Sequence, residues 1–371
     1  MNDILGAPLV HVLAGVGSVV LLGAIVWEVF ETIVLPRRVS RRLRLTHIYF
    51  RVLWRLWRVR GRRIHSYQRQ ENFLAVFGPL SLLLLLVVWA SLLIVGYAGL
   101  QWALGSALII AEGQSSFWAD LYFSGTTFLT LGLGDVIPRN DPARLITVIE
   151  VGTGFGLIAL VIGYLPVLYQ AFSRREVSIS LLDAHAGSPP TAAALLARHP
   201  PGRRQRILLT ILSEWERSTA DLLENYLSYS VLAYFRSQHD NQSWVAAIAM
   251  ILDACALLLA CEGQVGDELG EQAHYTFAMA RHLTVDMAIY LRLPKARMER
   301  RLAADELATL RSALAEAGLT LGSEEEARLA VLRGQYEKYL ATLARYLVMP
   351  LPHFVPAPGE HDDWESTAET D

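Results

Sequence analysis

Three long apolar stretches with a single charged side chain among them constrain this chain more than any other feature, because each is about long enough to cross a bilayer. Residues 8–27 and 73–104 contain no charged residue, and residues 145–172 contain only Glu150. A helix of roughly 20 apolar residues spans the hydrocarbon core. From residue 173 onward, charged residues recur at helical spacing and no comparable stretch appears. The sequence therefore predicts an all-α membrane protein with three spans and a helical C-terminal half.

A basic segment follows the first stretch. Between residues 36 and 70 there are twelve arginines and no acidic residue. Because arginine is enriched on the cytoplasmic side of membrane spans, we expect this segment and the C-terminal half in the cytoplasm and the N-terminus outside. Five of the arginines lie on one helical face, namely Arg44, Arg51, Arg55, Arg58 and Arg62. The stripe predicts a helix lying along the anionic lipids of the inner leaflet. The alternative, a voltage sensor, is disfavoured because the stretch is short and too charged to span.

Between the second and third stretches the chain reads Thr130-Leu131-Gly132-Leu133-Gly134-Asp135. A backbone can aim successive carbonyl oxygens to one side only if some residues adopt conformations that glycine takes easily. Gly132 and Gly134 suit that role, with Leu131 and Leu133 packing outward and Thr130 adding a hydroxyl. Rings of such carbonyls can replace the water shell of a cation. The string predicts a cation-binding strand rather than an ordinary glycine-rich turn.

This string resembles the selectivity filter of potassium channels of the pore-loop (ion-channel) superfamily, whose usual form is T-V-G-Y-G-D. The resemblance covers the stretch from residue 73 to residue 172 and points to bacterial members with an additional N-terminal helix. It implies an outer helix at 73–100, a pore helix at 115–129, a filter at 130–135 and an inner helix at 144–172. It also implies that K⁺ is the permeant ligand, that the carbonyls of residues 130–133 hold it, and that no other cofactor is needed.

A filter of this kind needs four equivalent strands around an axis, and the sequence contains one such string. The resemblance therefore implies a homotetramer. It also implies supporting roles for Tyr122 and Phe123, an aromatic pair that braces the filter, and for Thr127 on the pore helix. Two positions depart from the family. Leu129 replaces a threonine, and Leu133 replaces a tyrosine whose lost hydrogen bond is worth about 1 kcal/mol.

The inner helix carries three further candidates. Gly154 lies at the spacing from Gly134 that the family uses for a gating hinge, and close helix packing is the alternative. Pro166 removes a backbone hydrogen bond and predicts a kink near the inner end. Glu150 is an acid within a span, where a charge costs about 3 kcal/mol or more. We expect it to brace the filter; hydration at the outer interface is the alternative.

Residues 176–350 predict an α-helical cytoplasmic regulatory domain, with helices at 203–236, 243–261, 269–292, 301–317 and 324–347. The apolar run 244–260 is short and contains Asp253, so we interpret it as a buried helix rather than a fourth span. We find no glycine-rich phosphate loop and no catalytic set, which disfavours an enzyme. The polar turn at 236–243 is a candidate site for an unknown ligand, and a solvated turn is the alternative.

The predicted organisation is an N-terminal transmembrane helix, a basic amphipathic segment, a pore domain, the regulatory domain and a disordered acidic tail, at 1–35, 36–72, 73–175, 176–350 and 351–371. The predicted function is a potassium-selective channel of the bacterial inner membrane, gated at the inner helix by the cytoplasmic domain. Expected partners are copies of the chain and anionic lipids, without nucleic acid. The alternatives are a weakly selective cation channel and a membrane-anchored sensor or scaffold with a vestigial pore.

Overall fold

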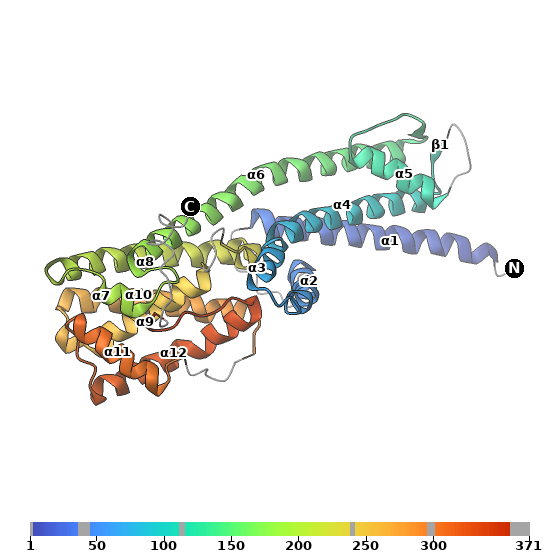
Figure 1. The fold of residues 1–371 in the computed structure, drawn as a ribbon. Helices are drawn as coiled ribbons and strands as arrows, with labels where there is room; N and C mark the ends of the chain where they lie inside the picture. The colour runs from blue at the N-terminus through green and yellow to red at the C-terminus, as the bar shows by residue number, and fades with distance from the viewer. Residues whose placement is uncertain (1–2, 36–44, 111–115, 238–241, 295–300, 357–371) are drawn as a thin grey trace, which may run out of the picture. The chain divides into compact units, whose positions relative to one another are not determined.

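The protein is helical almost throughout (Figure 1). The computed structural model describes residues 3–35, 45–110, 116–237, 242–294 and 301–356. Three helical stretches are long and apolar enough to cross a membrane, at Leu9–Val34, Tyr67–Ala103 and Asp141–Ala186. The predicted class, an all-α membrane protein, is confirmed.

Contacts divide the chain into two units. The membrane unit comprises Met1–Val59 and Val76–Tyr169, and the C-terminal unit comprises Arg60–Ala75 and Gln170–Asp371. One helix, α6 (Asp141–Ala186), contributes residues to both units. The helix α3 (Tyr67–Ala75) belongs to the C-terminal unit, although the sequence assigned its residues to the basic segment and the pore domain.

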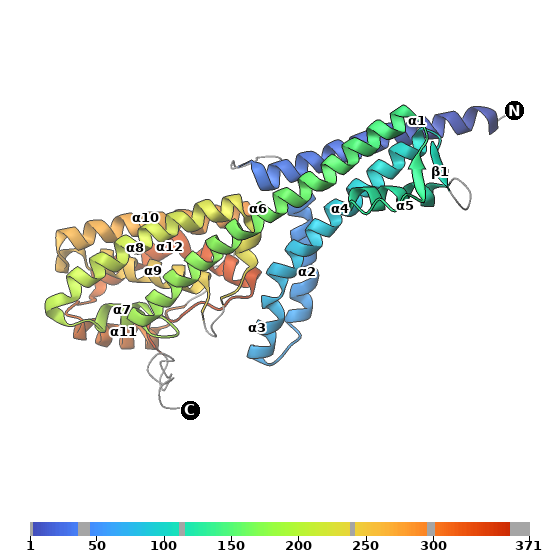
Figure 2. The ribbon, with the colours of Figure 1, turned by 90° about the horizontal axis from the view of Figure 1, so that it is seen from above.

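The remaining elements of the membrane unit are α1 (Asp3–Val29), η1 (Phe30–Val34), α2 (Leu45–Gly61), α4 (Phe77–Ala103), β1 (Leu108–Ile110), α5 (Phe117–Phe128) and β2 (Val136–Pro138). Helices α1 and α4 lie side by side (Figures 1 and 2). Their contact depends on small residues: a Cβ at Gly96 would approach Leu22 Cδ2 to 2.7 Å, and one at Gly99 would collide with Ser18. Small residues let membrane helices approach closely and gain van der Waals contact.

Two short strands close the segment between α4 and α6. Strand β1 pairs with β2 in antiparallel register, with Ile109 opposite Ile137. Leu108 of β1 and Val136 of β2 form a buried cluster with Phe123 of α5. The strand before α5 and the strand after the glycine string are therefore both packed against α5. The sequence pattern did not predict these strands, since three residues are too few to show a period.

The C-terminal unit is a helical bundle. Besides α3 and the end of α6 it contains α7 (Ala192–Ala197), α8 (Pro201–Ser228), η2 (Ser230–Tyr234), α9 (Trp244–Ala260), η3 (Glu262–Gln264), α10 (Asp267–Tyr290), α11 (Ala304–Glu316) and α12 (Ser323–Leu347). Helix α9 is its core: every residue except Leu259 is buried, against α7, α8, α10 and α12. The apolar run at 244–260 is thus a buried helix of this bundle, as its length and Asp253 indicated.

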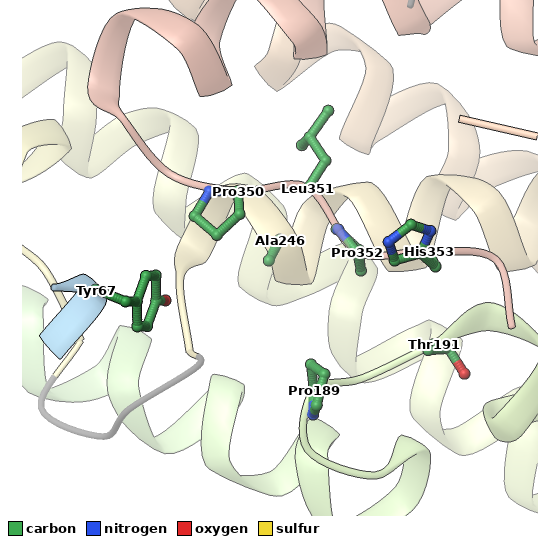
Figure 3. A pocket seen from close by; sticks show the side chains of 8 residues that line it. All are labelled: Tyr67, Pro189, Thr191, Ala246, Pro350, Leu351, Pro352 and His353. Atoms are coloured by element: carbon green, nitrogen blue, oxygen red, sulfur yellow. The ribbon is translucent and has the colours of Figure 1, made fainter. Parts of the chain in front are cut away.

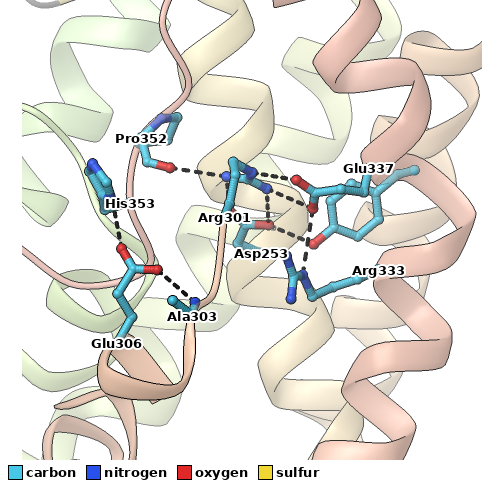
Figure 4. Close-up of polar contacts among 9 residues, drawn as sticks. Asp253, Arg301, Ala303, Glu306, Arg333, Glu337, Pro352 and His353 are labelled. Carbon is cyan, nitrogen blue, oxygen red and sulfur yellow. Dashed lines mark hydrogen bonds and ion pairs between the residues drawn. The ribbon is translucent and has the colours of Figure 1, made fainter. Parts of the chain in front are cut away.

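Asp253 is buried within α9 because a network of charged groups satisfies it (Figure 4). Arg301 donates to both Asp253 oxygens at 2.8 and 2.9 Å, and to Glu337 of α12 at 2.6 Å. The Tyr336 hydroxyl donates to Asp253 at 2.6 Å. Burial by itself lowers the pKa of Arg301, but the two carboxylates more than offset it and raise that pKa above the usual value. Arg301 therefore stays cationic inside the bundle.

Several predicted boundaries need correction. The inner helix continues to Ala186 rather than 172, and α8 ends at Ser228 rather than 236. Residues 351–356 are packed, although the sequence placed them in a disordered tail. Phe354 is fully buried, with the guanidinium carbons of Arg301 and Arg333 at 5.3 and 5.0 Å from its ring centre. These cation–aromatic contacts attach the segment to the bundle. The rest of the predicted tail, 357–371, lies outside the described residues.

Replacing Arg301 with Gln leaves two buried carboxylates without their cation. We expect a loss of about 3–5 kcal/mol in the stability of the bundle, the usual result of removing one partner of a buried ion pair. Amide hydrogen exchange in α9 measures it on the full chain. The matched control is Arg311→Gln, which removes the exposed pair with Glu326 and should cost less than about 0.5 kcal/mol. Equal effects of the two substitutions would contradict the assigned role of the network.

Candidate ion-conduction site

Helix α5 leads directly into the glycine string. It begins after Ser116, whose side-chain oxygen accepts a hydrogen bond from the Ala119 N–H at 3.4 Å, as an N-cap residue does. It ends at Phe128. Thr127, predicted as a support residue, is buried near this end, and Phe123 is buried in the cluster with the two strands. The string thus follows a helix that is capped at its start and buried at Phe123 and Thr127, which fixes where the string begins.

Backbone hydrogen bonds attach the string to the end of α5. The Thr130 N–H donates to the Thr127 carbonyl at 2.9 Å, and the Leu131 N–H donates to the Thr126 carbonyl at 2.7 Å. The Gly132 N–H also points to the Thr126 carbonyl, at 3.3 Å. Within the described part of the chain, the carbonyls of residues 130–133 accept no hydrogen bond. The first three N–H donors of the string are thus satisfied by α5, and the carbonyls of residues 130–133 remain for another partner.

The string alternates in backbone conformation. The φ angles of Thr130, Gly132 and Gly134 are +60°, +54° and +81°. Glycine adopts this left-handed region without penalty, as the sequence predicted for two of these positions. Thr130 was not expected there. A side chain branched at Cβ in this region costs on the order of 1–3 kcal/mol, and the hydrogen bond to Thr127 helps to hold the residue in place.

An aromatic residue of α5 binds the C-terminal end of the string. The Tyr122 hydroxyl on α5 donates to Asp135 Oδ2 at 2.9 Å. The side chains of Leu131 and Leu133 are 62% and 63% exposed in the single chain. The described residues of the same chain thus leave most of these two leucines uncovered. The sequence predicted that both would pack outward.

Residues 82–170 match a family model described as an ion channel. This segment is an ion-channel domain of the pore-loop kind. A membrane protein of Bacillus subtilis (strain 168), YdjJ, described as uncharacterized, is 27% identical over 188 residues. The alignment covers 50% of this chain and 54% of the relative, so the chain spans about half the length of the curated relative that it matches. No solved structure matches the chain.

Glu150 lies against the pore helix of the ion-channel domain. Its side chain is fully buried, and the Ser124 hydroxyl of α5 donates to its carboxylate. The same hydroxyl lies 3.0 Å from the Ile94 carbonyl of α4. Glu150 and Ser124 thus join α6, α5 and α4 at one point. Ser124 was not among the predicted site residues, although a buried acid requires a donor nearby and Ser124 lies one helical turn before Thr127.

Gly154 packs against the end of α5. A Cβ at this position would overlap the Phe128 carbonyl oxygen and lie 3.1 Å from its carbon. Only glycine allows α6 to approach the residue that ends the pore helix. Helix α6 continues without interruption through Gly154 and Pro166. The predicted roles of these two residues as a hinge and a kink stay predictions.

Three of the predicted basic residues lie on α2. Arg51 and Arg55 are exposed, Arg58 is half-buried, and Arg44 lies outside the described residues. Arg62 follows the end of α2 and donates to the Arg345 carbonyl at 2.9 Å.

Helix α2 has two further faces. One is buried: Trp54 packs on Phe77 with ring centres 4.8 Å apart, and Tyr49 donates to the Ser81 carbonyl at 2.8 Å. Trp54 therefore packs inside the protein rather than at the lipid surface. The other face is an exposed apolar stripe made of Leu45, Ile48, Val52, Leu56 and Val59. The stripe adjoins the arginines, as in helices that lie in a membrane surface.

The C-terminal unit contains a cavity of about 330 Å³ (Figure 3). Tyr67 of α3, Thr191 before α7, and Pro350 and His353 of the C-terminal segment are among its lining residues, none of which is Asp, Glu, Lys or Arg. Such a lining suits an uncharged small molecule better than a nucleotide. Residues 238–241 of the polar turn at 236–243, the candidate ligand site, lie outside the described residues.

The contact of Gly154 with Phe128 can be separated from a hinge role by Gly154→Ala. We expect the added methyl to displace the end of α5, destabilise the protein by about 1–3 kcal/mol and reduce ion selectivity. The control is Gly152→Ala, where a Cβ meets open space in the chain. The readouts are the thermal unfolding midpoint and the reversal potential under mixed-ion conditions. Altered opening at unchanged stability and selectivity would show a hinge and contradict the packing role.

Proposed function

We propose that this protein is a potassium-selective channel subunit and that residues 130–135 form its selectivity filter. The observation that carries the proposal is the string itself: the N–H groups of residues 130–132 are bonded to α5, the φ angles alternate, and the carbonyls of residues 130–133 are without partners among the described residues. Four such strands would surround a dehydrated K⁺ with carbonyl oxygens. The Thr130 hydroxyl would add the innermost ligand, and Asp135 would lie at the outer mouth.

A homotetramer is part of this proposal. One strand cannot enclose an ion, and the sequence supplies a single string. The exposure of Leu131 and Leu133 supports the assembly, since two large apolar side chains in solvent would be covered by neighbouring copies. Closed cyclic symmetry provides equivalent strands.

We place the channel in a bacterial inner membrane with its N-terminus outside and its C-terminal unit in the cytoplasm. The twelve arginines between residues 36 and 70 support this orientation. In this arrangement the C-terminal unit is the regulatory part and α6 carries its effect to the pore, with the predicted gate near Pro166. A ligand of the C-terminal unit would fit the cavity beside Tyr67.

A planar bilayer with K⁺ on one side and Na⁺ on the other tests the filter. We expect the reversal potential to shift toward the potassium equilibrium potential, by about 59 mV for each tenfold preference. Gly132→Ala should abolish the selective current, because alanine cannot hold the left-handed φ without strain. Gly156→Ala is a control, since a Cβ there meets open space in the chain.

A reversal potential near zero would favour the second candidate, a weakly selective cation channel. Leu129 and Leu133 favour this candidate because neither can donate the hydrogen bond of the residue it replaces. The absence of any current from correctly assembled protein would turn attention to a sensor or scaffold. Either result would contradict potassium selectivity.

We also propose that α2 binds anionic lipid headgroups. Arg51 and Arg55 are exposed beside the apolar stripe on the same helix. Each arginine near an anionic surface contributes about 1 kcal/mol, and the stripe would enter the boundary between headgroups and acyl chains. The opposite face of α2 is fixed to α4, so lipid binding would act on a helix attached to the pore.

Exchanging Arg51 and Arg55 for Gln tests this binding. We expect channel activity in wild-type protein to rise with the fraction of anionic lipid. In the double variant the affinity for anionic lipid should fall by roughly thirtyfold, since about 2 kcal/mol is lost. The control is Arg311→Gln, which makes the same change of side chain on a different helix, α11. An unchanged lipid dependence in the double variant would rule the proposal out.

A further inference from the structure

Two buried arginines meet at one short segment of the C-terminal unit, residues 229–237, which we name the clamp segment. It comprises the 3₁₀ turn η2 and the extended residues after it, between α8 and α9. The segment forms few regular backbone hydrogen bonds, which leaves carbonyls that side-chain donors can bind. Arg175 binds to the segment from α6, whereas Arg236 belongs to the segment and binds to α3. The end of α6 and α3 lie in the same unit; α6 includes the inner pore helix, and α3 leads into α4.

The first arginine comes from α6. Arg175 is 3% exposed and donates to the carbonyls of Leu232 and Phe235, both at 3.1 Å. It also donates to the Tyr226 hydroxyl at 3.3 Å and pairs with Glu176 at 2.9 Å. The guanidinium thus binds four partners at once, which the single ammonium group of a lysine could not do. Arg175 attaches the continuation of the inner helix to the clamp segment.

The second arginine belongs to the clamp segment. Arg236 is 8% exposed and forms an ion pair with Glu71 of α3. Its other terminal nitrogen donates to the carbonyls of Leu347 and Val348 at 2.7 and 2.8 Å. Helix α3 ends at Ala75, and α4, the outer helix of the ion-channel domain, begins at Phe77. Arg236 therefore attaches the start of the outer-helix segment to the same nine residues.

We propose that Arg175, Arg236 and Glu71 are positioning residues that couple the inner and outer pore helices through the clamp segment. This inference rests on the proposed channel function. A movement of the bundle that shifts residues 229–237 would displace α6 and α3 together, because both are held by desolvated, charge-assisted hydrogen bonds. The aromatic contact of Phe172 with Phe235, at 5.6 Å between ring centres, stiffens the α6 side of the joint.

The test is whether a substitution that weakens the contact of α3 with the clamp segment changes amide hydrogen exchange in α6, and the reverse. Glu71→Gln removes the charge while leaving the bonds of Arg236 to Leu347 and Val348 in place. We expect it to raise amide hydrogen exchange in residues 170–186 of α6 by about 5-fold or more, the lower range of energetic coupling between sites. Arg175→Lys should raise exchange in α3 by a similar factor. Exchange in α10 should stay unchanged in both, which separates coupling from general destabilisation.

The matched control is Glu324→Gln, which breaks the exposed pair with Arg328 on α12 and should affect neither side. The proposed coupling is disproved if Glu71→Gln raises exchange only in α3 and Arg175→Lys raises it only in α6. Single-channel recording completes the test: Glu71→Gln should change the ratio of open to closed time by about 5-fold with an unchanged reversal potential. An unchanged ratio in a conducting protein would also overturn the proposal. A wild-type protein without current counts against the channel function, and hydrogen exchange then decides the clamp alone.

Discussion

A short string whose carbonyls at residues 130–133 accept no hydrogen bond among the described residues is the central constraint on the ion-channel domain. Secondary structure normally satisfies such groups. In the string, the N–H groups of residues 130–132 are bonded to α5 and the φ angles alternate. The strained Thr130 shows that the conformation is imposed by these surroundings. Two further contacts hold the same region: α6 approaches the end of α5 closely at Gly154, and Tyr122 of α5 donates to Asp135.

Polar contacts between apolar helices provide the rigidity. Hydrophobic burial gives little net attraction between helices in lipid, so packing and hydrogen bonds must order them. Tyr97 of α4 meets Thr153 of α6 with 2.7 Å between oxygens, and Gln101 donates to the Ala143 carbonyl at 3.2 Å. Glu150 and Ser124 add α5 to the same arrangement. Through Ser124, the pore helix α5 is thus hydrogen-bonded to both membrane helices that flank it, α4 and α6.

The sequence predicted most of what depends on local chemistry. Three uncharged stretches predicted the membrane helices, the spacing of apolar residues predicted the bundle, and Gly132 and Gly134 predicted the left-handed positions. The sequence did not predict contacts between residues far apart along the chain. Nothing near residue 172 shows that α6 continues to Ala186, because that continuation depends on partners more than 50 residues away, such as Tyr226. The packing of Phe354 likewise depends on Arg301 and Arg333, which no local pattern connects to it.

Arg175 shows why the same residue can support two different conclusions. Its position just after the last apolar stretch fits the cytoplasmic side in the orientation that we propose. In the structure it is buried, and carbonyls of the clamp segment and the Glu176 carboxylate satisfy its charge. Arg174 beside it is exposed. A charged residue at the end of a span can therefore mark a membrane boundary or anchor the helix to a folded domain. Only its burial and hydrogen-bond partners distinguish the two.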